Sequence, residues 1–176
     1  MNTLEQLLKE WLHIRGFIVE TNLKVGRRSE LNPGTSAGGW VGELDVVAYH
    51  PVTGELYHFE PSLDSHTWDT RKERFARKFQ TGRDYIRTVA QFANVPAEHF
   101  ANLKQVALLS HTPKGMADRI EFAGGEAWTI DSFVEEVNAW VRSNWSVAWA
   151  GAIPESYPLL RVMQFSLVGN YRKVRA

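Results

Sequence analysis

The sequence predicts an α/β protein with a mixed central β-sheet flanked by helices. Two strand-like segments, residues 42–49 and 56–62, are separated only by a turn that contains Pro and Gly. That turn is too short for a crossover helix, so it predicts an antiparallel hairpin. In the second half, strand-like and helix-like segments alternate, which favours parallel pairing through right-handed crossovers. The predicted order is α-β-β-β-α-β-α-β-α, followed by a C-terminal helical extension.

Composition indicates a folded protein without a global polyanion-binding signature. The 176 residues are 44% hydrophobic and 12% aromatic, and 20 basic residues balance 20 acidic ones. Any nucleic-acid contact must therefore come from a local basic patch. The absence of cysteine excludes disulfides, thiolate zinc sites and a cysteine nucleophile. The N-terminus does not resemble a signal peptide, and no apolar run reaches membrane-spanning length, so we expect a soluble cytoplasmic protein without membrane contacts.

The N-terminal segment predicts a helix followed by a strand and a long loop. Apolar residues recur at positions 4, 7, 8, 11 and 12 with helical spacing. Thr3 and Gln6 fit a capping box, and Gly16 is expected just beyond the helix end. Residues 17–23 predict a strand, and residues 26–39 predict the loop.

The second half predicts a long basic helix and a set of alternating elements. The helix is expected from about residue 68 to about residue 93, with Phe75, Phe79 and Ile86 buried. Gly82 inside it indicates a close backbone approach. The predicted elements after it are a strand at 103–110, a short helix at 113–123, a strand at 127–130 and a helix through 133–141.

The composition changes after residue 143, which suggests a boundary. We expect a domain at 1–143 and a Trp-rich extension at 144–176, packed on the same domain or on a second subunit. Trp145 and Trp149 are expected to anchor this extension, and residues 156–168 predict its helix. The extension is also the expected surface for a homodimer or a partner protein.

Asp45 and Glu60 each place a carboxylate within an apolar strand of the predicted hairpin. Side chains alternate along a strand, so Asp45 shares a face with Glu43, and Glu60 shares one with His58. If those faces coincide, the two carboxylates lie close together and raise each other's pKa unless a cation lies between them. Mg²⁺ binds through one or two carboxylates together with water and phosphate oxygens.

With these residues the chain resembles the PD-(D/E)XK nuclease superfamily, which has the restriction-endonuclease-like fold. The resemblance covers roughly residues 3–141, and residues 106–141 look most like the Mrr-type branch. It implies that Asp45 matches the family's strand Asp and Glu60 the Glu of its Glu-X-Lys motif. It also implies an acid on the first helix, for which Glu5 is the first candidate and Glu10 the weaker one.

This chain has Ser62 where that family has its lysine. Serine carries no positive charge that could stabilise a transition state at phosphorus. The family tolerates migration of the lysine to the following helix, where Lys78 is the first candidate and Lys72 the second. The resemblance further implies Mg²⁺ or Mn²⁺ held by Asp45, Glu60 and the Pro61 carbonyl.

The helix after Glu60 carries seven basic residues against three acidic ones between positions 69 and 87. This pattern predicts either a solvated helix face or a phosphate-contacting face beside the carboxylates. The residues expected to contact DNA are Arg71, Arg74, Arg77 and Arg83.

Two functions follow from these observations. The first is a metal-dependent endonuclease that hydrolyses phosphodiester bonds in DNA. The alternative is a catalytically inactive nuclease-fold module that binds nucleic acid or a protein partner. A lysine ammonium beside Asp45 and Glu60 would support the enzyme, and its absence would support the module.

Overall fold

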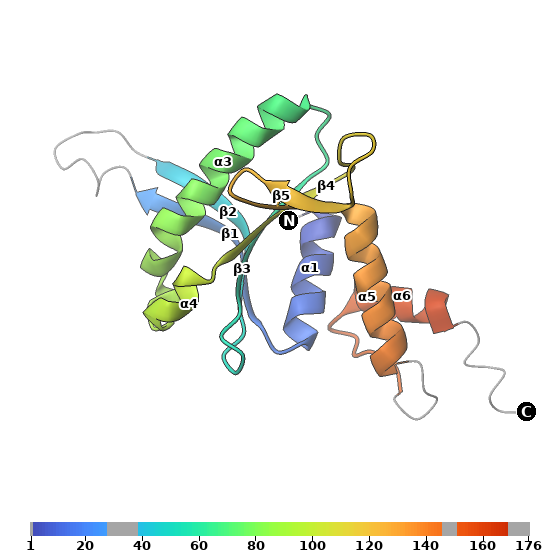
Figure 1. The fold of residues 1–176 in the computed structure, drawn as a ribbon. Coiled ribbons are helices and arrows are strands. Elements are labelled where there is room, and N and C mark those ends of the chain that lie inside the picture. Colours follow the sequence, from blue (N-terminus) through green and yellow to red (C-terminus); the bar gives the residue numbers. More distant parts are fainter. Residues whose placement is uncertain (1, 28–38, 146–150, 169–176) are drawn as a thin grey trace, which may run out of the picture.

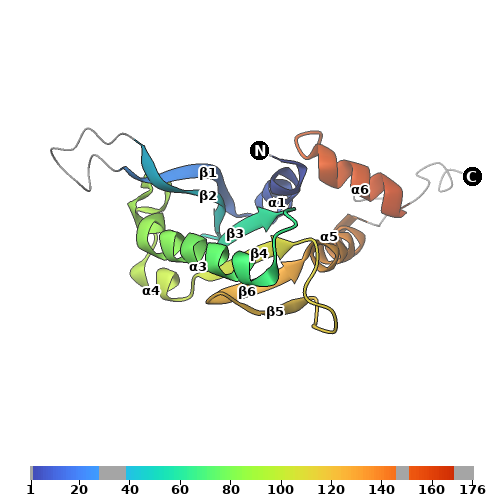
Figure 2. The same ribbon diagram turned by 90° about the horizontal axis from the view of Figure 1, so that it is seen from above.

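A mixed β-sheet forms the centre of the molecule (Figure 1). The computed structural model describes residues 2–27, 39–145 and 151–168. These residues form a six-stranded sheet in the order β1-β2-β3-β4-β6-β5. Figure 2 shows α3 on one side of this sheet, with α1 and α6 on the other. The predicted α/β class with a mixed, helix-flanked sheet is therefore confirmed.

Antiparallel and parallel pairing occupy different parts of the sheet. The strands are β1 (Ile18–Arg27), β2 (Trp40–Tyr49), β3 (Leu56–Ser62), β4 (Lys104–Leu109), β5 (Arg119–Phe122) and β6 (Gly125–Thr129). The first three pair antiparallel, β3 to β4 and β4 to β6 pair parallel, and β5 runs antiparallel to β6. The hairpin expected at 42–62 is the β2–β3 pair.

Helix α1 (Thr3–Ile14) begins with a different capping box from the expected one. The Asn2 side chain accepts a hydrogen bond from the Glu5 backbone amide at 2.9 Å, and the Asn2 amide donates to Glu5 Oε2 at 3.2 Å. The predicted capping box of Thr3 and Gln6 was therefore wrong by one residue, because Thr3 is already part of the helix. Gly16 follows the helix at φ +93°, as expected for a residue just past a helix end.

Helix α3 (Trp68–Tyr85) is shorter than the predicted helix. Val89 adopts an extended backbone, which interrupts the run between the short 3₁₀ turns Ile86–Thr88 and Ala90–Phe92. A further short helix, α4 (Ala97–Ala101), follows. Phe75 and Phe79 are buried as predicted.

The helix expected at 113–123 is absent, and an edge strand, β5, covers its last residues. Pro113 begins a turn closed by the Met116 amide, and Gly115 at φ +86° prevents a helix from continuing. Strand β5 then pairs with β6 through a tight turn at Ala123 and Gly124, both at positive φ. The backbone groups of residues 119–122 thus hydrogen-bond to the free edge of β6, whereas in a helix they would bond within their own segment.

Helices α5 (Ile130–Trp145) and α6 (Pro158–Val168) pack with α1 against the face of the sheet opposite α3. Ile153 and Leu160 are buried in this core. The Glu10 carboxylate accepts hydrogen bonds from the Leu159 and Leu160 amides, at 2.9 and 3.1 Å. The described part of the extension therefore packs on the same chain, while Trp149 lies outside the described residues.

Within the described ranges, no helix combines the length and the apolar character needed to cross a membrane.

Candidate functional site: a carboxylate–lysine cluster

Asp45 and Glu60 lie side by side on the antiparallel strands β2 and β3. Val46 pairs with Phe59, so the next pair along the ladder brings Asp45 opposite Glu60. The Asp45 backbone amide lies 3.4 Å from Glu60 Oε1. The Glu60 side chain is fully buried, whereas the Asp45 side chain retains 18% exposure. The two carboxylates therefore share one face of the sheet, as the period-two alternation predicts.

Lys78 reaches both carboxylates from α3. Its ammonium donates to Asp45 Oδ2 at 3.2 Å and also to Glu60 Oε2. Phe75 and Phe79, one turn apart on the same helix, are buried beneath α3 and hold it against the sheet. This packing turns Lys78 towards the carboxylates while leaving 32% of its side chain exposed. One cation thus bridges two anions at the junction of β2, β3 and α3.

The two carboxylates differ in their affinity for a proton. Burial and then the negative charge of Glu60 raise the pKa of Asp45 from 3.8 to about 7, against the opposing effect of Lys78. Burial would also raise the pKa of Glu60, but the hydrogen bond from His58 and the positive charge of Lys78 lower it to about 2. Near neutral pH, Glu60 is therefore ionised while Asp45 is partly protonated.

The same groups stabilise the charge of Lys78. Burial alone would lower the pKa of its ammonium, but the two carboxylates outweigh burial and raise it. Lys78 thus stays positively charged at neutral pH.

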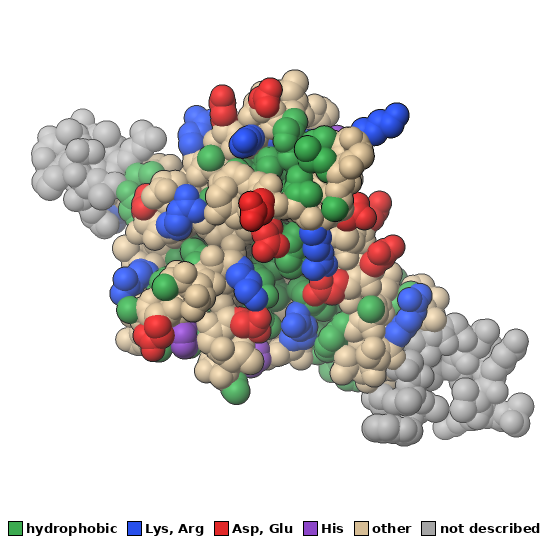
Figure 3. All heavy atoms as spheres, in the orientation of Figure 1, with side chains coloured by type: hydrophobic (Ala, Val, Ile, Leu, Met, Phe, Trp, Pro, Cys, Tyr) green, Lys and Arg blue, Asp and Glu red, His purple; other side chains and the backbone are tan. Residues whose placement is uncertain are grey.

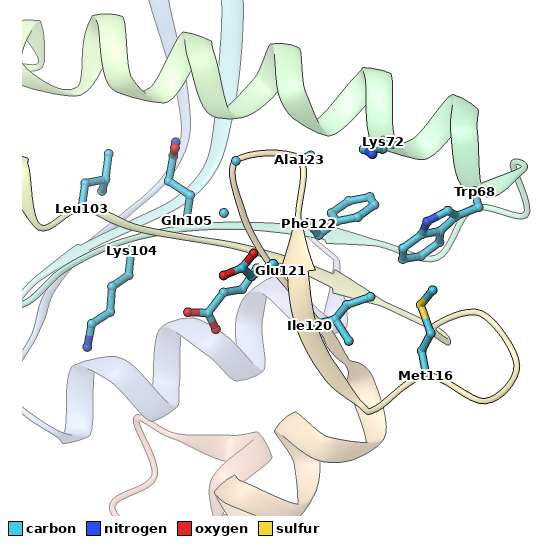
Figure 4. A pocket seen from close by; sticks show the side chains of 13 residues that line it. Trp68, Lys72, Leu103, Lys104, Gln105, Met116, Ile120, Glu121, Phe122 and Ala123 are labelled. Atoms are coloured by element: carbon cyan, nitrogen blue, oxygen red, sulfur yellow. The ribbon is translucent and has the colours of Figure 1, made fainter.

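Lys72, the second candidate for the missing lysine, lies elsewhere on α3. It lines a cavity of about 830 Å³ together with Trp68, Phe122 and the β5–β6 turn (Figure 4). Neither carboxylate of the cluster lines this cavity. The geometry therefore distinguishes between the two lysines and brings Lys78 to Asp45 and Glu60.

The two candidate acids of the first helix make other contacts. Glu5 forms the capping box with Asn2 at the start of α1. Glu10 is buried and binds the first amides of α6, as described above, and it also accepts from Gln6 at 2.8 Å. Neither residue hydrogen-bonds to the carboxylate–lysine cluster, so the structure brings no first-helix acid into it.

Ser62, where the resemblance implies a lysine, belongs to a separate polar cluster. Its hydroxyl donates to Asp64 and accepts from Arg74 Nη2 at 2.8 Å. Arg74 also pairs with Asp64. Burial would raise the pKa of Asp64, but the hydrogen bonds from Ser62 and Arg71, with further contacts, hold it well below its usual range. Position 62 thus carries a neutral hydroxyl that accepts a hydrogen bond from Arg74.

The four arginines predicted to contact DNA differ in exposure. Arg71 is 1% exposed, and its guanidinium holds Asp64 and the β3–α3 loop, so it is buried and not part of an exposed surface. Arg74 is half-buried over Ser62, and Arg77 is exposed. Arg83 donates to Gln105 Oε1 at 2.6 Å. On the face shown in Figure 3, basic and acidic side chains are interspersed.

Gln105, on β4, was not singled out from the sequence. It is 4% exposed and lies among the apolar residues of a central strand. The sequence feature that points to Gln105 is its polar side chain next to the apolar run 106–109. A buried amide side chain requires a hydrogen-bond partner.

The donor set suits a hard divalent cation. Asp45 and Glu60 supply clustered carboxylate oxygens, and burial followed by the negative charge of Glu60 raises the pKa of Asp45. In the described part of the chain, no group of three or more His, Asp or Glu side chains forms a metal-binding arrangement. Mg²⁺ commonly uses only one or two carboxylates.

Comparisons with protein-family models, with curated proteins and with solved structures find no match to this chain.

Proposed function

We propose that this protein is a metal-dependent nuclease that hydrolyses phosphodiester bonds in DNA. The observation that carries the proposal is the Lys78 ammonium on both carboxylates of the Asp45–Glu60 pair. An aspartate and a glutamate can hold a divalent ion, and a lysine can stabilise negative charge at phosphorus, which are the roles that the resemblance implies. Lys78 takes the place of a lysine at position 62.

Asp45, Glu60 and the Pro61 carbonyl are the groups that would hold Mg²⁺ or Mn²⁺. When bound, such an ion acidifies a water molecule and neutralises phosphate charge. Lys78 contributes a permanent positive charge beside the reacting phosphate, and its 32% exposure leaves it accessible from solvent. As a compact charge on a flexible stem, lysine can move from the carboxylates to a phosphate oxygen.

The DNA backbone would be seated by the exposed side of α3. Arg77 immediately precedes Lys78 in the sequence and is exposed. Arg74 lies one turn earlier and is partly exposed. Because acidic side chains are interspersed with basic ones on this side (Figure 3), the contact would be local and would involve few phosphates.

The test is cleavage of duplex, single-stranded and branched DNA with Mg²⁺ or Mn²⁺. We expect Asp45→Asn, Glu60→Gln and Lys78→Met each to lower the cleavage rate by at least about 100-fold, the range seen when a single electrostatic catalytic group is removed. Lys72→Met is the matched control, because it removes the same charge from the same helix without touching the carboxylates.

The alternative is a catalytically inactive module, and one observation favours it. The resemblance implies a lysine at position 62, but this position holds Ser62, whose hydroxyl carries no positive charge and is engaged with Asp64 and Arg74. Wild-type protein that binds DNA but cleaves none of these substrates would establish this alternative and refute the nuclease. Equal loss of activity in Lys72→Met and Lys78→Met would refute the assignment of Lys78.

A further inference from the structure

A chain of buried polar side chains runs from α3 through β4 to Glu60, and the proposed chemistry does not use it. His58 is fully buried on β3, and Gln105 is 4% exposed on β4. Arg83 closes the chain at the surface end. Buried polar groups in such a chain must all find partners, so their orientations are mutually constrained.

The surroundings of Gln105 determine which end of its amide faces which neighbour. Arg83 can only donate, and its Nη1 lies 2.6 Å from Gln105 Oε1. The Phe79 carbonyl can only accept, and Gln105 Nε2 donates to it at 2.7 Å. The amide nitrogen of Gln105 therefore also faces His58 Nδ1, at 3.1 Å.

This orientation determines the tautomer of His58. Because Gln105 donates, Nδ1 must accept and carries no hydrogen. The ring hydrogen is then on Nε2, which lies 2.7 Å from Glu60 Oε1 and donates to it. Each hydrogen bond in the chain then joins a donor to an acceptor, from Arg83 to Glu60.

Packing prevents the imidazole from leaving this position. A Cβ on Gly82 would overlap the His58 ring and lie 2.9 Å from Gln105 Nε2, so α3 approaches the ring as closely as a backbone can. The Phe79 ring packs edge-on against His58, with 6.1 Å between centroids. This is the close approach that Gly82 predicts from the sequence.

We propose that His58, held as the Nε2–H tautomer by Gln105, is a positioning residue for Glu60. It hydrogen-bonds to Oε1, which also lies near the Asp45 amide, and thereby directs Oε2 towards Lys78. The role in metal binding rests on the proposed function, whereas the tautomer and the carboxylate orientation do not. Once Lys78 moves to a phosphate oxygen, a carboxylate held in this way would offer Oε2 to an ion without turning itself.

The first test reads the ring nitrogens of His58 by NMR in protein labelled with ¹⁵N-histidine, without divalent ions, at pH 8. The wild type should show the Nε2–H tautomer. Gln105→Glu replaces the donor facing Nδ1 with an acceptor, so Nδ1 should gain a hydrogen. Gln80→Glu is the matched control, since Gln80 is the other partner of Arg83 but does not contact the ring. An Nδ1–H tautomer in the wild type would overturn the proposal, as would an unchanged pattern in folded Gln105→Glu.

The second test measures Mn²⁺ affinity by calorimetry. His58→Leu removes the donor to Glu60 and should weaken binding about 10- to 100-fold, the usual effect of losing a group that orients a metal ligand. His58→Gln places an amide near the former Nε2 and should recover part of that loss. Equal affinity in wild type and His58→Leu would overturn the positioning role. If the wild type binds no Mn²⁺, the proposed function fails, and the NMR pattern alone decides on the His58 tautomer.

Discussion

Replacing Asp45 by asparagine should stabilise the protein at alkaline pH and change little at acidic pH. The pKa of Asp45 is raised from 3.8 to about 7, so the folded state holds a proton that the unfolded chain has already lost. Stability from this group is therefore fully present below about pH 4 and is lost as pH rises towards 7. Asparagine cannot ionise, so Asp45→Asn removes this loss.

The size of the effect follows from the same shift. A pKa change from 3.8 to about 7 corresponds to a ceiling of about 4 kcal/mol. The Asp45 side chain is 18% exposed and Lys78 contacts it, so solvent screening and the lost ion pair reduce the expected gain to about 1–2 kcal/mol at pH 8. Glu60→Gln should have the opposite sign, because the lowered pKa of Glu60 contributes stability above about pH 4.5 that is lost as pH falls towards 2.

Equilibrium urea unfolding in EDTA at pH 3 and pH 8 measures both effects. Glu43→Gln is the control, because Glu43 lies on the same strand but is exposed. Asp45→Asn should raise the free energy of unfolding at pH 8 and leave it nearly unchanged at pH 3. A variant that is less stable than the wild type at pH 8 would refute the reasoning and would make Asp45 a structural ion-pair partner.

Three further predictions concern α3 and the C-terminal helix. Gly82→Ala should destabilise the protein by about 1–3 kcal/mol despite alanine's helix propensity, because the new Cβ overlaps the His58 ring; an unchanged urea midpoint would contradict this packing. Glu10→Gln should weaken the cap of α6 by about 1 kcal/mol and speed amide exchange there, and exchange unchanged at Leu160 would show that the cap is dispensable. Arg77→Ala should lower the log–log salt slope of duplex DNA binding by about 0.9, whereas Arg142→Ala, on α5, should not; equal slopes in both would remove α3 from the interface.

The carboxylate pair was predictable because it depends on local rules. The turn at 50–55 determines antiparallel pairing, and the alternation of side chains then brings Asp45 and Glu60 to one face. Phe75 and Phe79 indicate which side of α3 is buried, and the resemblance implies the lysine on this helix, for which Lys78 beside them is the first candidate. The shared face and the buried side of α3 need only neighbouring residues and the known periods of strand and helix.

The helix expected at 113–123 failed for a non-local reason. Its Pro-initiated start resembles that of a helix, but residues 119–122 alternate in a way that suits the free edge of β6. Hydrogen bonds offered by a strand elsewhere in the sheet outweighed the local preference. The capping of α6 by Glu10 is likewise non-local, because about 150 residues separate the two partners.

The sequence by itself determined the α/β class, the hairpin and the shared face of Asp45 and Glu60, since each follows from patterns within a few residues. Only the tertiary structure decided between Lys78 and Lys72, because that choice depends on how α3 is rotated on the sheet by Phe79 and Gly82. It also revealed the link from Gln105 to His58, whose atoms meet only because β3 and β4 pair in parallel. Contacts between strands 47 positions apart leave no periodic trace in the chain.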